Sequence, residues 1–178
     1  MGDYVTILNF SDRKDGNCAT IVRYISDSCS NSNICVYSIS EYVQPCADCN
    51  YECLRPAERC PNYATIKEVM DRVMESDLVY YIVPNFCGFP CANYFAFNER
   101  TVGYFNLDRD LMKKFMSICK KFIVVSNSEN EMFYNAMAQQ SANPQILYMK
   151  TSKYGKRSID GDMLDSDEAK ADLDGFLH

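Results

Sequence analysis

The chain has 178 residues, 47% hydrophobic and 24% charged, with a formal net charge of -6. This length and composition predict a single globular domain spanning residues 1–178. The acidic balance excludes a nucleic-acid-binding protein, and no apolar stretch reaches the roughly 20 residues that a membrane-spanning helix needs.

Histidine and cysteine usage narrows the chemistry further. The single histidine is the last residue, His178, which excludes Ser-His-Asp and Cys-His catalysis and histidine-based zinc sites. Ten cysteines without a recognisable signal peptide predict reduced thiols and a cytoplasmic protein. Any chemistry must therefore come from a cofactor, cysteines or carboxylates.

The first elements are a strand and a helix joined by a polar turn. Residues 4–8 form an apolar run of strand length, and residues 18–29 carry apolar side chains at helical spacing. Residues 34–39 read as a second strand, and the cysteine-rich segment 40–63 that follows is irregular. Loops of that length are usually functional.

The middle of the chain continues the alternation. A capping box from Thr65 to Glu68 predicts a helix that ends near Ser76, and residues 78–83 are continuously apolar, as in a strand buried on both faces. Residues 95–104 and 110–116 are predicted to be helical.

The last elements are two strands and two helices. Residues 122–125 and 145–149 are predicted strands, a capping box from Ser128 to Glu131 opens one helix, and Ser166 caps another. The alternation predicts a doubly wound, five-stranded parallel sheet of order 2-1-3-4-5 in a three-layer α/β/α domain. The loops after strands one, three and four, residues 11–18, 84–91 and 126–129, then meet at one edge of the sheet.

The first of these loops is a candidate anion site. Free backbone N–H groups and the macrodipole at a helix start favour a negative group, and Ser11, Arg13 and Asn17 can add side-chain donors. The loop is neither a Walker loop nor a G-x-G-x-x-G fingerprint. A solvated turn that happens to hold an arginine is the alternative.

The loop from Ser11 to Cys18 resembles the phosphate loop of the flavodoxin-like NAD(P)H-dependent FMN reductases, Gly-Ser-Pro-Arg-x-x-Gly-Asn-Ser/Thr. The turn from Pro84 to Pro90 stands where that family has a Pro-x-Tyr-Trp-Gly-like turn, and residues 98–100 resemble its Asp-Arg signature. Residues 122–127 and 154–170 resemble its fourth strand with the third loop and its closing segment, so the similarity spans nearly the whole chain.

The resemblance implies an FMN-dependent oxidoreductase that takes a hydride from NAD(P)H and passes electrons to a flavin, quinone or other small acceptor, without a protein catalytic residue. It also implies a homodimer, with the cysteine-rich segment or residues 95–105 near the partner. The FMN-binding residues that it implies are Ser11, Arg13, Lys14, Gly16, Asn17, Cys18, Pro84, Asn85, Phe86, Cys87, Gly88, Ser126 and Asn127.

Three positions depart from the family pattern. Phe10 replaces its glycine, Asp12 its proline and Cys18 its serine or threonine, and each change is unfavourable to a phosphate. Phe86 stands at the family's tyrosine position, where it could equally be a core aromatic.

Cys46, Cys49, Cys53 and Cys60 form a second constellation, with spacing that could hold a 4Fe-4S cluster or a zinc ion. The related iron-sulfur flavoproteins carry four cysteines here, and so do cluster-free members of the reductase family. We favour reduced thiols. Two other functions stay open: an electron-transfer flavoprotein, with or without a cluster, that serves a protein partner, and a flavin-free binding module.

Overall fold

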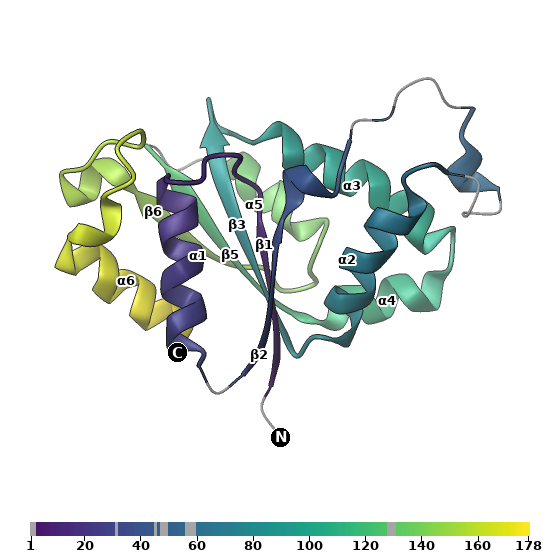
Figure 1. Ribbon diagram of the computed structural model, residues 1–178, viewed down its shortest axis with the longest axis horizontal. Helices are drawn as coiled ribbons and strands as arrows, with labels where there is room; N and C mark the ends of the chain where they lie inside the picture. The colour runs from purple at the N-terminus through teal and green to yellow at the C-terminus, as the bar shows by residue number, and fades with distance from the viewer. Residues whose placement is uncertain (1–2, 31, 45, 47–49, 56–59, 128–130) are drawn as a thin grey trace.

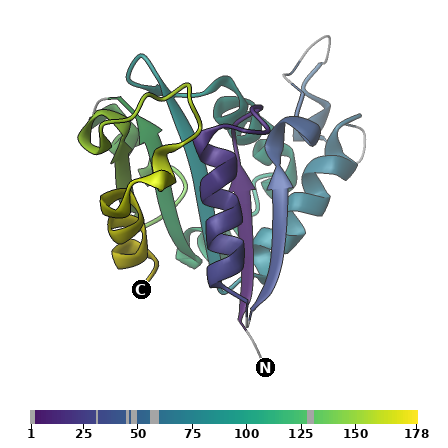
Figure 2. The ribbon, with the colours of Figure 1, turned by 60° about the vertical axis from the view of Figure 1, so that its left-hand side comes forward.

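A computed structural model describes residues 3–30, 32–44, 46, 50–55, 60–127 and 131–178. Its core is a parallel sheet in the order β2-β1-β3-β5-β6, shown in Figure 1 and, turned by 60°, in Figure 2. The parallel strands are β1 (Tyr4–Asn9), β2 (Asn33–Ser38), β3 (Leu78–Phe86), β5 (Cys119–Ser126) and β6 (Gln145–Lys150). The predicted strand order is therefore confirmed.

The sheet departs from the prediction at the end of β3. This strand runs three residues beyond the predicted 78–83 and pairs in an antiparallel hairpin with the short strand β4 (Phe89–Pro90). Pro84 does not end the strand: it still aligns with Val125 of β5. A continuous apolar run therefore marked only the part of β3 that both helix layers cover.

Helices cover both faces of the sheet. One face packs against α1 (Asn17–Ser28) and α6 (Asp167–Leu177). The opposite face packs against four helices. These are α2 (Tyr63–Glu75), α3 (Ala92–Phe105), α4 (Arg109–Ser117) and α5 (Glu131–Ala138).

Alternating side chains on β3 join the two halves of the core. Tyr80 and Ile82 point toward α1 and α6, whereas Val79, Tyr81 and Val83 point toward the other helix layer. Because both faces are covered, the strand is apolar at every position rather than at every second one.

The helix starts agree with the sequence in part. Ser166 caps α6 as expected, by accepting a hydrogen bond from the backbone N–H of Ala169. The predicted capping box at Thr65 is not formed. α2 begins two residues before Thr65, at Tyr63, and the Thr65 hydroxyl donates to the Asn62 carbonyl. The box predicted at Ser128 lies outside the described residues.

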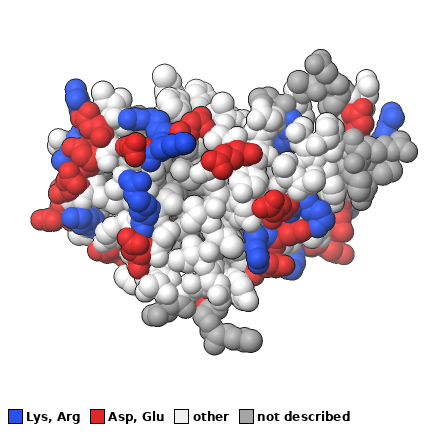
Figure 3. Space-filling model, viewed as in Figure 1, with Lys and Arg blue, Asp and Glu red and all other residues white. Residues whose placement is uncertain are grey.

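The distribution of surface charge and the character of the helices complete the description of the fold. Acidic and basic side chains are intermingled on the face in Figure 3. Within the described ranges, no helix combines the length and the apolar composition that a membrane crossing requires.

Candidate functional site

A cavity of about 630 Å³ lies where the carboxyl ends of β1 and β3 meet. Its walls come from five segments of the chain. They are residues 10–13, 16–18, 84–86, 90–93 and 158–159, joined by Val125. This is the topological switch point of a doubly wound sheet, where such folds bind ligands.

Eight of the thirteen predicted cofactor residues line the cavity: Ser11, Arg13, Gly16, Asn17, Cys18, Pro84, Asn85 and Phe86. The other five lie around it. Lys14 is exposed on the first loop, and Cys87 and Gly88 form the turn between β3 and β4. Ser126 and Asn127 hold neighbouring segments in place, as described below.

The polar end of the cavity is formed by residues 11–13, 16 and 17 together with Ser158 and Ile159. The side-chain oxygens of Asn9 and Ser11 accept from the backbone N–H groups of Ser11 and Arg13, at 3.0 and 3.3 Å, which shapes the turn. Gly16 is the N-cap of α1; it provides no side-chain cap, and the first turn holds no acidic residue. The start of α1 therefore keeps donors that can face an anion.

Phe10 leaves the loop and enters the core. Its ring is 1% exposed and lies 5.4–5.7 Å from the rings of Tyr81, Tyr94 and Phe97. The side chain therefore points away from the polar turn and into the core.

Asn93 ties the first loop to α3. Its Nδ2 donates to the Phe10 carbonyl at 3.1 Å and to Asp12 Oδ1 at 2.8 Å. Asn93 is not predicted from the sequence, because the contact joins positions 81 residues apart and no motif marks it. The Asp12 carboxylate is thus held against a neutral amide rather than left free over the helix start.

The hairpin of β3 and β4 forms the opposite wall. Asn85 Oδ1 accepts from the Gly88 N–H at 2.8 Å, and Asn85 Nδ2 donates to Ser126 Oγ at 2.5 Å. Cys87 and Gly88 both have positive φ, 53° and 89°, which a two-residue turn of this type requires. Phe86 is 64% exposed, so the alternative of a core aromatic is wrong at this position.

Two buried thiols sit between these walls. Burial, and to a smaller extent the nearby Cys91, raises the pKa of Cys18 to about 12. Burial likewise raises the pKa of Cys91 to about 11, and its Sγ donates to the Phe10 carbonyl. Both thiols are therefore protonated at physiological pH. A thiol is a weaker hydrogen-bond donor than a hydroxyl, so Cys18 is a weaker donor than a serine or threonine would be.

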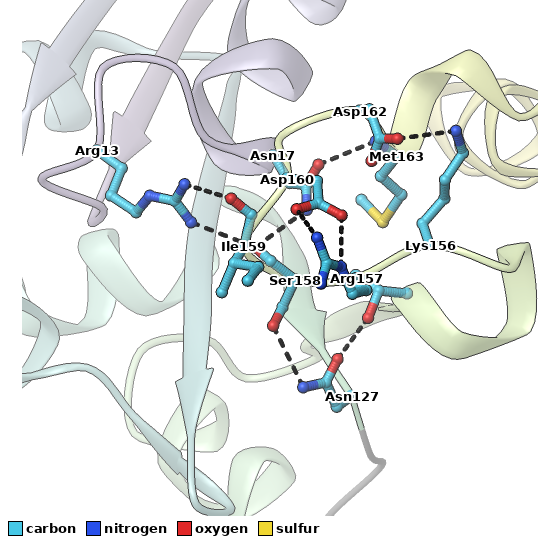
Figure 4. Close-up of polar contacts among 11 residues, drawn as sticks. Arg13, Asn17, Asn127, Lys156, Arg157, Ser158, Ile159, Asp160, Asp162 and Met163 are labelled. Atoms are coloured by element: carbon cyan, nitrogen blue, oxygen red, sulfur yellow. Dashed lines mark hydrogen bonds and ion pairs between the residues drawn. The ribbon is translucent and has the colours of Figure 1, made fainter.

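The segment Lys156–Met163, which we call the strap, closes the polar end (Figure 4). Arg13 donates to the carbonyls of Ser158 and Ile159, at 3.4 and 2.5 Å. Asn127 Nδ2 donates to Ser158 Oγ at 3.2 Å, and Thr151 donates to the Asn127 side chain. Ser158 and Ile159 were not predicted as site residues; the only sequence signal was the similarity of this stretch to a family's closing segment.

The described cysteines of the segment 40–63, which we call the cysteine loop, lie apart from this cavity. Cys46, Cys53 and Cys60 line a separate space of about 30 Å³ with Glu99 and Arg100. Cys49 lies outside the described residues, and the residues that are described contain no group of three or more side chains arranged to hold a metal ion. The structure therefore gives no support to the 4Fe-4S or zinc alternative.

Arg100, on α3, lies beside the cysteine loop. It is 6% exposed, and its Nε donates to the Gln44 carbonyl at 2.5 Å. Its Nη2 is buried and has no hydrogen-bond partner among the described residues.

No protein-family profile and no curated protein sequence matches the chain. Solved structures do. An NAD(P)H:quinone oxidoreductase from Methanothermobacter marburgensis matches with a TM-score of 0.63 at 13% identity, covering 100% of this chain and 98% of that one.

Two further structures match over most of their lengths. FerB, a flavoenzyme NAD(P)H:(acceptor) oxidoreductase from Paracoccus denitrificans, has a TM-score of 0.62 at 13% identity, covering 98% of this chain and 95% of that one. An NADH:FMN oxidoreductase in its apo form has a TM-score of 0.55 at 10% identity, covering 98% and 88%. At these identities the likeness establishes a flavodoxin-like α/β fold.

Proposed function

We propose that the protein is an FMN-dependent NAD(P)H oxidoreductase that passes electrons to a small acceptor. The observation that carries the proposal is the cavity at the switch point, with a helix start at one end and an apolar hairpin wall at the other. Three structures with this fold bear the names of NAD(P)H or NADH oxidoreductases, which supports the same activity.

The residues present fit FMN in size and in polarity. A volume of about 630 Å³ lies in the range of small-molecule sites. The N–H groups at the start of α1, with Asn17 and Arg13, suit a phosphate, and the ring of Phe10 does not obstruct them. Pro84 and Phe86 offer an apolar wall for a planar ring system.

When bound, FMN would supply the redox chemistry, accepting a hydride from NAD(P)H and delivering electrons to the acceptor. The protein binds and orients. The polar end would hold the phosphate, and residues 84–86 would line the ring. The exposed Phe86 would lie where the nicotinamide and then the acceptor approach.

Anaerobic titration tests the proposal. The purified protein should bind one FMN, and NADH or NADPH should then bleach the visible absorbance of the flavin. A protein that binds FMN but is not bleached would instead be an electron-transfer flavoprotein. A protein that does not bind FMN would be a flavin-free binding module, and either result would overturn the proposal.

We further propose a cytoplasmic homodimer, whose partner covers part of the hairpin and of α3. The exposed Phe89 and Phe95 support this arrangement, because large aromatic side chains on a surface often mark an interface. Light scattering of the purified protein tests it, and a monomeric mass at micromolar concentration would contradict it.

A further inference from the structure

The strap is attached to the first loop and to α1 by side chains from three positions. Besides the two Arg13 contacts, Asn17 Nδ2 donates to the Ser158 carbonyl at 3.3 Å, and Asn17 Oδ1 accepts from the Met163 N–H at 3.0 Å. Thr20 Oγ1 lies 3.3 Å from the Gly161 carbonyl and donates to it. Figure 4 shows the strap crossing beside the start of α1, with the side chains of Arg13 and Asn17 turned toward it.

Gly161 makes the closest approach of the two backbones. Its φ is +79°, and a Cβ at this position would lie 2.3 Å from the Asp15 carbonyl oxygen. Only glycine fits such a contact, since both the φ and the missing side chain are needed. The strap is therefore packed directly on the backbone of the first loop.

The charges within the strap are paired with one another. Arg157 binds both carboxylate oxygens of Asp160, and Lys156 lies 2.9 Å from the Asp162 carboxylate. The contacts that attach the strap to the first loop and α1 are therefore hydrogen bonds from Arg13, Asn17 and Thr20, rather than ion pairs.

Arg13 can hold the strap and a ligand at the same time. Its side chain runs past Gly16, whose Cβ would lie 3.1 Å from Arg13 Cβ and 3.6 Å from Nε. A guanidinium has five N–H donors in a fixed plane, and the strap carbonyls engage two of them. Three donors remain, and the same two bonds fix the plane of the guanidinium that carries them.

We propose that the strap is the second wall of the phosphate site, and that Arg13 couples its docking to the phosphate monoester end of the ligand. The inference rests on the proposed function, which it deepens. The strap orients the guanidinium, the phosphate binds the donors left free, and each step stabilises the other. Arg13 thus acts both as a ligand of the phosphate and as a positioning residue for the strap.

Hydrogen exchange of the backbone amides in residues 155–163 tests the coupling. We expect FMN to slow exchange in the strap, whereas riboflavin, which lacks the phosphate, leaves it unchanged. Inorganic phosphate should also slow it, relative to chloride at equal ionic strength. Equal protection by riboflavin, or no protection by FMN and phosphate, would overturn the inference.

Two variants test the contacts themselves. Gly161→Ala pushes the strap away from Asp15, and Arg13→Lys keeps the charge but loses the planar fork. Both should speed strap exchange in the ligand-free protein and weaken FMN binding by about tenfold or more, with riboflavin binding changed by less than about twofold. Should Gly161→Ala fail to fold, Arg13→Lys carries the test alone.

The controls are two other glycines. Gly155→Ala introduces a side chain at φ +66° with no atom within 4 Å, and Gly175→Ala adds one to α6 in open space. Neither should change the ratio of FMN to riboflavin affinity. A wild-type protein that binds FMN without strap protection refutes the coupling alone, whereas a wild-type protein that binds no FMN refutes the proposed function.

Discussion

The polar end of the main cavity and the cysteine loop differ in how their polar groups are satisfied. At the polar end, Arg13 and Asn17 donate to carbonyls of the strap, and Asn17 also accepts from Met163. Beside the cysteine loop, the buried Nη2 of Arg100 on α3 has no partner among the described residues. The sequence offers both regions as candidate ligand sites, but only in the first do the described residues line a cavity large enough for a cofactor.

The difference follows from the topology of the sheet. β1 lies between β2 and β3, and the helices that follow β1 and β2 cover opposite faces. A crevice therefore opens at the carboxyl end of β1, whatever the loops contain. The cysteine loop has no such support, and close spacing along the chain has not brought its described thiols into a metal site. In this protein the topology of the sheet, more than the spacing of residues along the chain, determines where a candidate ligand site forms.

The largest expected effect separates packing from binding within the main cavity. Phe10→Ala should lower the free energy of unfolding by about 3–5 kcal/mol, because it removes a ring buried among Tyr81, Tyr94 and Phe97. Phe86→Ala, at the exposed hairpin, should change stability by about 0.5 kcal/mol or less and weaken FMN binding. Urea denaturation and FMN titration measure the two quantities.

The opposite results would contradict the assignment of Phe10 to the core and of the hairpin to the flavin site. If Phe10→Ala left stability unchanged, the ring would not be part of the core. If Phe86→Ala bound FMN as tightly as wild type, the hairpin would not line the flavin site.

The sequence predicted the parts of this site that depend on local pattern. Alternation of strands and helices predicted the strand order, and the apolar spacing over residues 18–29 predicted α1 to within one residue at each end. The contacts of Asn93 with Asp12 and of Arg13 with Ile159 span 81 and 146 residues. Such contacts depend on how the folded elements pack. In neither pair does the sequence around one residue indicate which residue it will contact.

Alkaline pH should destabilise the main cavity through its two thiols. The folded pKa values of Cys18 and Cys91, about 12 and about 11, lie above the value near 9 of an unfolded cysteine. The folded state therefore keeps protons that the unfolded chain loses above pH 9, and stability falls as the pH rises from 9 to 11. Each thiol contributes up to about 1.4 kcal/mol per pH unit in that window.

Denaturation at pH 8, 9, 10 and 11 measures this slope. Cys18→Ala and Cys91→Ala should each flatten it, whereas Cys119→Ala, at an exposed position, should not. An unchanged slope in both buried variants would mean that these thiols ionise as freely in the folded protein as in the unfolded chain.

A matched pair of substitutions compares the two regions directly. Asn17→Ala removes a donor to Ser158 and leaves the Met163 N–H without its acceptor, which should cost about 1–3 kcal/mol of stability. Arg100→Met removes a buried cation that has one described hydrogen bond, so its effect should be about 1 kcal/mol or less in either direction. A loss of 3 kcal/mol or more in Arg100→Met, measured by urea denaturation, would mean that groups around Arg100 do satisfy its buried charge.

The smallest expected effect concerns Asp12, a carboxylate of the first loop. Asp12→Asn keeps an oxygen that can accept from Asn93 but removes a negative charge. A unit charge about 10 Å from a dianion costs about 0.8 kcal/mol in water, so FMN affinity should rise about fourfold at low salt, and the gain should shrink as salt is added. Asp3→Asn, just before the start of β1 at the opposite edge of the sheet, is the control and should leave affinity unchanged. If Asp12→Asn also had no effect at low salt, the phosphate would lie out of reach of the first loop, and the comparison with the cysteine loop would lose its basis.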